Sequence, residues 1–524
     1  MIPLLSSDQM RALDRNAIET LGIPGIILME NAARSILESI EDQFEDVQGL
    51  AVAILCGPGN NGGDGFALAR QLHLRGAEVD AILLSDPKKL KGDALANFKW
   101  LDSIGVQTLE WNPEIDLDDY DLLIDALFGT GGERTPEGLF ADAIRAMNAA
   151  AAPVIAIDIP SGVDASTGRV PGEAVLATTT VTLQCAKAGL LLPPGRDFAG
   201  DLIVAPISIP EEDDLLEQAA FFLPELEDVV EEFPPRPNDA HKGDFGKLLV
   251  IAGSRGMSGA ARMVAAAALR SGVGLVKVAC PEVIRAEVAA QIPEIMTIGL
   301  PSTAEGTIAA DAIETLKTYL EWADAIAVGP GLGTHPDTGV FLSALFAATT
   351  LPLVIDADAL NLIAAHQLVR QIPASAILTP HPGEFERLIR GTNSSLDFYA
   401  RTEAAREYAQ VNQITLHLKG APSITFDAHG RAVVNSTGNP GMATAGVGDV
   451  LTGIIASLRA QAFDAFDAAW IGAYLHGLAA DIAVEQMGEV SLVAGDVIRY
   501  LPAAFRALHH TEDEHDHDEA HGGA

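Results

Sequence analysis

The feature that most constrains the fold of this chain is a series of short, almost wholly apolar runs that alternate with helical patterns. In the first 160 residues they are LAVAILC, EVDAILL, DLLIDAL and PVIAIDI, at 50–56, 78–84, 121–127 and 153–159. Runs this apolar are typical of strands that helices cover on both faces, and hence of parallel sheets. We therefore expect an α/β protein.

A second set of such runs follows an acidic segment that ends in Pro234, Pro235 and Pro237, residues that hold a chain extended. The second set lies at 247–253, 275–280, 325–331, 353–359, 376–382 and 414–420. At 524 residues the chain is too long for one core, so two α/β domains are expected. The predicted organisation is a first domain at 1–213, an acidic Pro-rich linker at 214–238, a second domain at 239–508 and a disordered tail at 509–524.

Charge and composition exclude several classes of protein. The chain has 33 basic and 72 acidic residues, a net charge of −39, which argues against a nucleic-acid partner because phosphates need Lys and Arg. Its 3 cysteines are far apart and indicate no disulfide framework. The N-terminus lacks a secretory pattern, and the apolar stretch 338–355 is broken by Thr349, Thr350 and Pro352, which predicts a helix, a turn and a strand. We expect a cytoplasmic protein without a membrane span.

The tail is rich in histidine and acidic residues between His509 and His521. Such a segment buries too little apolar surface to fold, which favours a flexible, solvated end. Histidine among carboxylates can also bind Ni²⁺ or Zn²⁺, so a metal-binding role for the tail stays open.

A glycine-rich segment follows the first strand, GPGNNGGDG at 57–65, and a helix is expected after it. In open α/β sheets, loops at the carboxyl ends of strands bind ligands, and a helix N-terminus favours a phosphate. A tight turn would also explain the glycines. The oxygen-bearing side chains of Asn60, Asn61 and Asp64 go beyond what a turn needs and favour a binding site.

Two further strand ends carry polar side chains. Asp125 precedes Gly129, Thr130 and Gly131, and IDIPSGVD places Asp158, Ser161 and Asp164 after the next apolar run. Helix capping would explain any one of these residues. Together, three strand ends that bear Asp, Asn and Ser predict a polar pocket with hard oxygen ligands for a cation.

In the second half, the segment 435–458 is a run of small residues followed by an apolar helix. Gly446 and Gly448 precede Asp449, and such a loop can turn its N–H groups toward phosphoryl oxygens. A carboxylate beside it can take a proton from a hydroxyl group. A plain helix cap at Asp449 would leave the small residues unexplained. His381, in TPHPGE, could be structural.

These motifs resemble a known pair of enzyme domains. GPGNNGGDGFALAR, DALFGTG and DIPSGVD resemble the NAD(P)HX epimerase domain. HKGDFGKLLVIAGS, VGPGLG, IDADALN, LTPHPGE and GNPGMATAGVGDVLTG resemble the ADP/ATP-dependent NAD(P)HX dehydratase domain. The matches occur in the family's order and cover nearly the whole chain. The resemblance implies a Rossmann-like three-layer domain followed by a ribokinase-like three-layer domain, together repairing hydrated NADH and NADPH.

The resemblance also implies roles for residues of the first domain. Asp158 would transfer protons as the R and S hydrates interconvert at C6. The hydrate would be bound by Asn60, Asn61, Gly62, Gly63, Asp64, Gly129, Thr130, Gly131, Gly132, Glu133, Arg134, Thr135 and Asp158. A potassium ion would be bound by Asn61, Asp125 and Ser161.

In the second domain, the resemblance implies that Asp449 acts as a base on the C6 hydroxyl group. The hydrate would lie against Ala260, Gly331, Gly333, His381 and Asp449. ADP or ATP, with Mg²⁺ as a candidate companion ion, would contact Lys419, Gly420, Ala421, Pro422, Ser423 and Gly448.

The chain departs from the family pattern at three positions. Gly132 stands where an apolar residue is usual, Val447 where the loop usually has threonine, and Met257 where a tyrosine is usual. Losing the threonine hydroxyl removes one phosphate contact but leaves the backbone N–H groups. Asp158 and Asp449 are unaffected.

Two alternative functions remain open at this point. The second domain could be a ribokinase-like small-molecule kinase, since those enzymes share the GxGD loop. The first domain could be a non-catalytic module that binds nucleotides, RNA or a protein, although the strong negative charge disfavours RNA. The expected partners are NAD(P)HX and ADP or ATP, with no nucleic acid and no membrane, and a homo-oligomer is expected.

Overall fold

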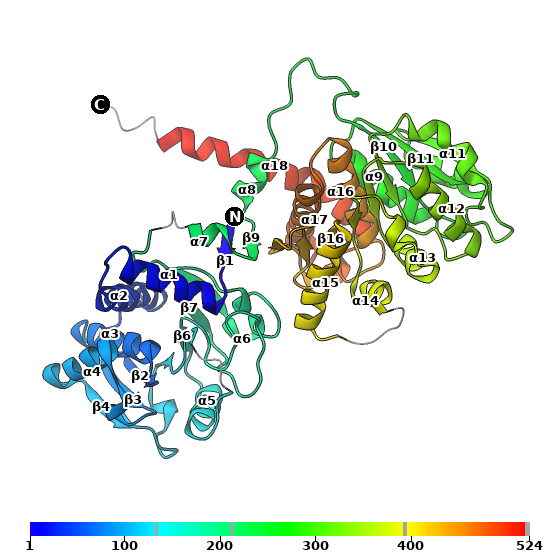
Figure 1. The fold of residues 1–524 in the computed structure, drawn as a ribbon. Coiled ribbons are helices and arrows are strands. Elements are labelled where there is room, and N and C mark those ends of the chain that lie inside the picture. The colour runs from blue at the N-terminus through cyan, green and yellow to red at the C-terminus, as the bar shows by residue number, and fades with distance from the viewer. Residues whose placement is uncertain (132–134, 211–213, 391–395, 519–524) are drawn as a thin grey trace. The chain divides into compact units, whose positions relative to one another are not determined.

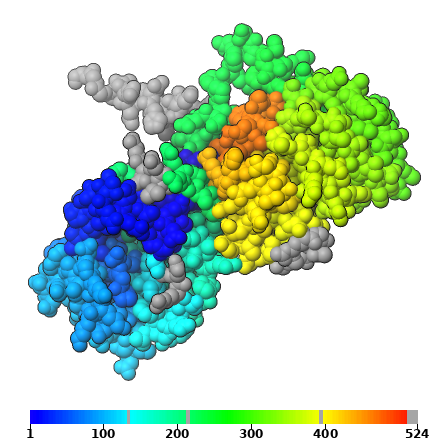
Figure 2. Space-filling view, in the orientation of Figure 1, coloured from blue at the N-terminus to red at the C-terminus, as the bar shows by residue number. Residues whose placement is uncertain are grey.

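The structure is a computed structural model that describes residues 1–131, 135–210, 214–390 and 396–518. It forms two compact units, Ile2–Phe221 and a second from Phe222 onward that includes Met1. Each unit contains a largely parallel sheet with helices packed on it (Figure 1), and side chains fill the space between the ribbons (Figure 2). The predicted α/β class is confirmed.

The seven-stranded sheet of the first unit has the order β4-β3-β2-β5-β6-β7-β8, and every neighbouring pair is parallel. Its strands are β2 (Ala51–Cys56), β3 (Glu78–Leu83), β4 (Gln107–Glu110), β5 (Leu122–Ala126), β6 (Val154–Ile157), β7 (Thr179–Leu183) and β8 (Asp201–Ala205). The four apolar runs of this half form β2, β3, β5 and β6. The direction in which the chain crosses the sheet reverses between β2 and β5, and ligands bind outside the carboxyl ends of strands at such a point.

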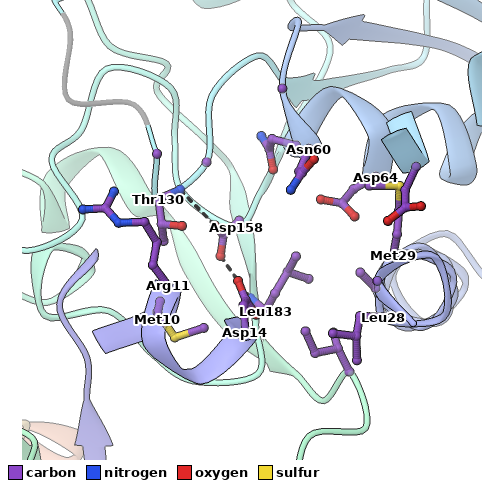
Figure 3. Close-up of a pocket in the computed structure, with 18 of the residues that line it drawn as sticks. Met10, Arg11, Asp14, Leu28, Met29, Asn60, Asp64, Thr130, Asp158 and Leu183 are labelled. Atoms are coloured by element: carbon purple, nitrogen blue, oxygen red, sulfur yellow. Dashed lines mark hydrogen bonds between the residues drawn. The ribbon is translucent and has the colours of Figure 1, made fainter. Parts of the chain in front are cut away.

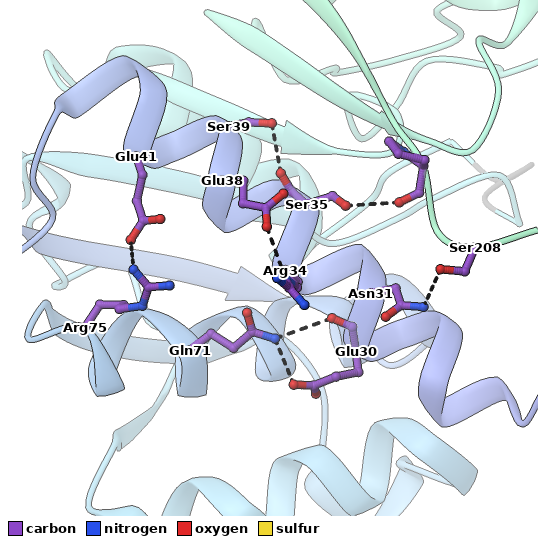
Figure 4. Close-up of polar contacts among 11 residues, drawn as sticks. Glu30, Asn31, Arg34, Ser35, Glu38, Ser39, Glu41, Gln71, Arg75 and Ser208 are labelled. Carbon is purple, nitrogen blue, oxygen red and sulfur yellow. Dashed lines mark hydrogen bonds and ion pairs between the residues drawn. The ribbon is translucent and has the colours of Figure 1, made fainter. Parts of the chain in front are cut away.

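The helices of this unit are α1 (Ser7–Glu19), α2 (Gly25–Phe44), α3 (Asn60–Leu74), α4 (Gly92–Ile104), α5 (Leu139–Ala149), α6 (Arg196–Ala199) and α7 (Asp214–Glu217). Short 3-10 turns are η1 (Pro87–Lys89), η2 (Leu117–Asp119) and η3 (Ala188–Leu190), and β1 (Ile2–Leu4) precedes α1. Polar contacts hold α2 in place (Figure 4). Gln71 on α3 donates to Glu30 at 3.0 Å, and Ser35 donates to the carbonyl of Pro206 at 3.0 Å.

The glycine-rich segment after β2 is helical from Asn60, whereas the sequence predicted a loop to residue 65. Its glycines allow α3 to approach the sheet closely. A Cβ on Gly62 would lie 2.0 Å from the carbonyl oxygen of Gly57, and one on Gly65 would lie 2.6 Å from the Ala126 Cβ. Packing therefore explains these glycines, and the helix N-terminus lies at the ligand edge of the sheet.

The sheet of the second unit includes the strands β9-β18-β17-β16-β15-β14-β13-β10-β11-β12, in this order. Its strands are β9 (Phe221–Leu223), β10 (Lys247–Ile251), β11 (Leu275–Pro281), β12 (Met296–Leu300), β13 (Ala325–Val328), β14 (Leu353–Ile355), β15 (Ile377–Leu378), β16 (Thr415–Leu418), β17 (Ile424–Phe426) and β18 (Ala432–Val434). Pairing is parallel from β12 across to β16 and antiparallel for β16, β17 and β18. The six apolar runs form β10, β11, β13, β14, β15 and β16, and the order reverses between β10 and β13.

The helices of this unit are α8 (Leu226–Glu231), α9 (Ser258–Arg270), α10 (Arg285–Ala289), α11 (Ala312–Leu320), α12 (Pro336–Ala348), α13 (Asp358–His366), α14 (Pro382–Arg390), α15 (Phe398–Asn412), α16 (Val447–Ala460), α17 (Ala465–Met487) and α18 (Ala494–Asp518). The 3-10 turns are η4 (Glu282–Ile284), η5 (Val369–Gln371), η6 (Pro440–Met442) and η7 (Glu489–Ser491). The stretch 338–355 is a helix, a turn and a strand, as predicted. Among the described residues, no helix is both long and apolar enough to cross a membrane.

Helices and a strand occur in two segments that the sequence predicted to be a linker and a disordered tail. The expected linker, 214–238, contains α7, β9 and α8. The backbone of α18 continues to Asp518, into the segment where a disordered tail was expected, and 519–524 lie outside the described residues. The limits themselves stay predictions.

Candidate active sites

A pocket of about 460 Å³ lies in the first unit at the carboxyl ends of β2, β5 and β6 (Figure 3). Helices α1, α2 and α3 also contribute to its wall. The predicted site residues that line it are Asn60, Asn61, Asp64, Gly129, Thr130, Gly131 and Asp158. Pockets of this size suit a small molecule or part of a nucleotide. The three polar strand ends are therefore brought together.

Asp158 directly follows β6 and has φ 70, a left-handed conformation that costs a non-glycine residue free energy. Its Oδ1 accepts from Lys187 Nζ at 2.7 Å, and its Oδ2 accepts from the N–H of Thr130 at 3.2 Å. Lys187 is fully buried and also donates to the carbonyl of Leu183 at 2.6 Å. This buried ion pair fixes the Asp158 carboxylate at the pocket wall.

Lys187 was not among the predicted site residues. The signal was a lone lysine in the largely apolar stretch 182–193. A lysine is almost never fully buried unless it is paired. A lysine in an apolar stretch therefore indicates a buried acidic partner, but it does not identify which residue that partner is.

Two further carboxylates face this pocket, Asp14 from α1 and Asp64 from α3 (Figure 3). Burial raises the pKa of Asp64 well above its ordinary value, and the negative charges of Asp158 and Asp14 raise it further. Burial also raises the pKa of Asp14, and Asp158 adds to that effect while Lys187 opposes it. The pocket thus combines an ion-paired carboxylate with two whose pKa is raised.

Asp125 and Ser161 lie beside the pocket and bond to each other. The Ser161 hydroxyl donates to Asp125 Oδ1 at 2.7 Å, and the Ser161 N–H donates to Oδ2 at 2.7 Å. Asp125 is fully buried, and its burial raises the pKa to about 6 although these bonds lower it. Gly129 lies next to Asn61, because a Cβ on it would be 3.3 Å from the Asn61 amide oxygen.

The residues present fit a potassium ion. Carboxylate, hydroxyl and amide oxygens are hard ligands suited to such a cation. The Asp125 carboxylate is fully buried, and a cation would compensate its charge. Among the described residues, no cluster of three or more His, Cys, Asp or Glu side chains is arranged to bind a metal ion.

The remaining predicted residues of this site lie elsewhere. Gly62 and Gly63 are buried within α3, where Gly63 packs against Met29. Thr135 is exposed and packs beside Gly172. Gly132, Glu133 and Arg134 fall outside the described residues.

In the second unit, Asp449 lies in the first turn of α16, whose N-cap is Gly446 with φ 89. The pKa of Asp449 is raised to about 6. Burial is the main cause, repulsion from Asp356 raises the pKa further, and the positive charge of Lys419 opposes the rise. The predicted helix follows, but it begins at Val447, so Asp449 is a helical residue. Acidic side chains are stabilised at this end of a helix.

Asp356 and Lys419 form an ion pair beside this turn, with Lys419 Nζ 2.5 Å from Asp356 Oδ1. The Thr452 hydroxyl donates to Asp356 Oδ2 at 2.6 Å. A Cβ on Gly448 would lie 3.3 Å from Lys419 Nζ, so the glycine keeps this approach open. Asp356 and Thr452 were not predicted, although Asp356 lies in the quoted motif IDADALN.

Lys419 begins the turn between β16 and β17. The other predicted nucleotide-contacting residues in that turn are Gly420, Ala421, Pro422 and Ser423. The turn is fixed at both ends, because the Lys419 N–H donates to Pro380 at 2.9 Å and Asn435 donates to the carbonyl of Ser423 at 2.9 Å.

Gly331 and Gly333 follow β13 in left-handed conformations, with φ 65 and φ 74. A Cβ on Gly331 would lie 3.0 Å from the Ala260 Cβ, which places these two predicted residues in contact. The N–H of Gly333 donates to Asp358 at 2.8 Å. Met257, where the family usually has tyrosine, also lies against Gly331.

His381 is half-exposed after β15. Its Nδ1 accepts from the N–H of Gly383 at 3.1 Å, and its own N–H donates to Glu384 at 2.9 Å. Burial lowers the pKa of His381, and the positive charges of Lys419 and Arg387 lower it further. His381 thus lies within electrostatic reach of the Lys419–Asp356 pair and also caps its own helix.

Two family models match the chain. One, described as NAD(P)H-hydrate dehydratase, matches residues 248–503, and the other, described as YjeF-related protein N-terminus, matches 25–189. The bifunctional NAD(P)H-hydrate repair enzyme Nnr of Moorella thermoacetica is 41% identical over 517 residues, which cover 96% of this chain and 97% of that protein. The chain belongs to this family.

The bifunctional NAD(P)H-hydrate repair enzyme of Escherichia coli is 33% identical, over 99% of this chain and 96% of that one. A solved structure of an ADP/ATP-dependent NAD(P)H-hydrate dehydratase from Bacillus subtilis, co-crystallised with ATP and Mg²⁺, is 28% identical. It covers 54% of this chain and 97% of that one, with a TM-score of 0.45. The family prediction from the motifs is confirmed, as is the order of the two domains.

Proposed function

We infer that this chain is a bifunctional enzyme that repairs hydrated NADH and NADPH. Its first domain interconverts the R and S hydrates, and its second dehydrates the S hydrate with ADP or ATP. The observation that carries this conclusion is the nearly full-length match to the Moorella repair enzyme, together with two separate carboxylate-bearing sites in one chain.

In the epimerase, Asp158 is proposed as a proton-transfer residue at C6 of the hydrate. Its buried bond to Lys187 holds the carboxylate at the wall of the pocket. The N-terminus of α3, with Asn60, Asn61 and Asp64, and the segment 129–131 are proposed to bind the nucleotide. Backbone N–H groups at a helix N-terminus favour phosphate, which supports this orientation.

Potassium is proposed to bind at Asn61, Asp125 and Ser161. The ion would supply a positive charge beside the buried Asp125 carboxylate and tie the β5 and β6 strand ends to the start of α3. In this arrangement Asp125 and Ser161 position the segment after β5, because the Phe128 N–H donates to the Ser161 hydroxyl at 2.9 Å.

In the dehydratase, Asp449 is proposed as the base that acts on the C6 hydroxyl group. Its partly buried position near Asp356 supports a carboxylate that exchanges protons near neutral pH. Lys419, the turn 420–423 and Gly448 are proposed to contact ADP, which we take as the nucleotide. The hydrate is proposed to lie against Ala260, Gly331, Gly333 and His381.

Separate substitutions test this division of labour. Asp158→Asn should slow epimerisation of the R hydrate by about 10²-fold or more and leave ADP-dependent dehydration of the S hydrate unchanged. Asp449→Asn should slow the dehydration of the S hydrate and leave epimerisation of the R hydrate unchanged. Chromatographic separation of the two hydrates and of NADH measures both. The assignment fails if either variant keeps the wild-type rate of the step it should lose.

A second experiment tests the alternative function, a kinase activity of the second domain. Incubation with ATP and pyridoxine or hydroxyethylthiazole should give no phosphorylated product. Turnover of either compound, without dehydration of the hydrate, would favour the kinase. A cytoplasmic location and a homo-oligomeric state also remain proposals, which fractionation and light scattering would test.

A further inference from the structure

Helix α1 contributes to the epimerase pocket although the match to the N-terminal family model begins at residue 25. Met10, Asp14 and Ile18, four residues apart, present one face of this helix to the cavity, together with Arg11. Residues at this spacing share a helix face. The helix is held firmly, because the Ser6 side chain caps it and Leu13 and Ala17 are buried.

Asp14 and Asp158 point into the same cavity but have different surroundings (Figure 3). Asp158 is paired with the buried Lys187 and accepts a backbone N–H. Asp14 has a pKa raised by burial and by the charge of Asp158. The other charged groups that line the pocket are Arg11, Asp64 and Asp93. Two carboxyl groups that lie in one pocket but have different partners can take the separate roles of base and acid.

Opening the ring of the substrate requires two proton transfers, one at each of the two heteroatoms bonded to C6. In a hydrate at C6, that carbon bears both the hydroxyl group and the ring nitrogen N1. When the hydroxyl proton leaves, the C6–O bond becomes a carbonyl and the C6–N1 electron pair moves to N1, which must then receive a proton. Rotation of the opened aldehyde and reversal of the same step on its other face gives the opposite epimer, with no net gain or loss of atoms or electrons.

We propose that Asp14 is the second proton-transfer residue of the epimerase. Protonated Asp14 gives its proton to N1 while Asp158 takes the proton of the hydroxyl group, and both protons return when the ring closes. Asp64, the third carboxylate, lies on the start of α3, where the nucleotide is proposed to bind. This inference rests on the proposed epimerase function of the same pocket.

The test compares Asp14→Asn with Glu19→Gln in the full chain. Glu19 ends the same helix, is exposed and is not among the residues that line the pocket, so it controls for a charge change on α1. Asp14→Asn should slow epimerisation of the R hydrate by about 10²-fold or more, the range for loss of a general acid. Glu19→Gln should stay at the wild-type rate. Dehydration of the S hydrate should be unchanged in both, which shows that the second unit is folded, and an unchanged circular dichroism spectrum and Tm show the same for the first.

Two further measurements separate an acid from a structural residue. The wild-type rate should fall on the alkaline side of its pH profile as Asp14 loses its proton, and Asp14→Asn should lack that limb. Asp14→Glu, which keeps the acid, should recover part of the lost rate. Epimerisation by Asp14→Asn at the wild-type rate, or no recovery with glutamate, would overturn the inference. If Asp158→Asn also epimerised normally, the proposed function of the pocket would fail with it.

Discussion

Both sites use carboxylates that the fold keeps partly or wholly out of water. Asp449 is the clearest case, because burial and Asp356 raise its pKa to about 6. As a base it must be deprotonated, so kcat/KM for dehydration of the S hydrate should fall as pH drops below about 6 and level off above it. A pH series with saturating ADP measures this. A rate that stays constant well below pH ~5 would contradict the role of Asp449.

Asp125, a proposed potassium ligand, makes the stability of the fold depend on pH. Because its pKa is about 6 when folded and 3.8 ordinarily, the folded chain binds more protons between these values. Stability without potassium should therefore decrease by about 3 kcal/mol as pH rises through this window, with the full loss present above it. Bound at the proposed site, potassium would compensate the ionised carboxylate, so replacing choline by potassium should raise Tm more at pH ~7.5 than at pH ~5.

The control for that experiment is Asp125→Asn, which removes the charge. Its Tm should respond equally weakly to potassium at both pH values in thermal unfolding at matched ionic strength. A wild-type response that does not depend on pH would show that potassium acts elsewhere.

Single residues were predictable from the sequence when they lay in the loop or strand end that carries the site. Asp158 and Asp449 are of this kind, since each lies where a strand or a glycine turn ends. Lys187 and Asp14 were missed because what marks them is tertiary: Lys187 pairs with Asp158, 29 positions away, and Asp14 lines the same pocket as Asp158, 144 positions away. The residue pattern of a short segment cannot identify a partner that lies so far away in the sequence.

Among elements, the apolar strands were the most predictable because helices cover both of their faces. β7 was missed because three of its five residues are threonine, and β17 because a threonine lies at its centre. The start of α3 was placed too late, since its glycines suggest a loop. In the structure they are the residues that let this helix pack on the sheet.

That packing can be tested with one methyl group. Gly62→Ala would place a Cβ 2.0 Å from the Gly57 carbonyl oxygen, so the free energy of unfolding should fall by about 1–3 kcal/mol. Gly59→Ala is the matched control, because no atom lies within 4 Å of its Cβ position. Urea unfolding followed by circular dichroism compares the two. Equal stability of both variants would contradict the close approach of α3.

For the whole molecule, the central claim is that two α/β units of one chain complete a single repair. An epimerase alone would leave the hydrate unrepaired, and a dehydratase specific for the S form alone would leave half of a mixed substrate behind. The sequence predicted two α/β units from its apolar runs, but the identity of the substrate depended on family motifs. Periodicity cannot encode a ligand, because many chemistries share these folds.

The most direct test gives the purified chain an equal mixture of R and S hydrates with ADP and potassium. Recovery of reduced nicotinamide is followed by its absorbance. We expect the wild-type chain to convert the whole mixture in one rapid phase. With Asp158→Asn, the rapid phase should end when half of the reduced nicotinamide has been recovered. A wild-type chain that also stops at half, or that recovers no NADH at all, would contradict the account.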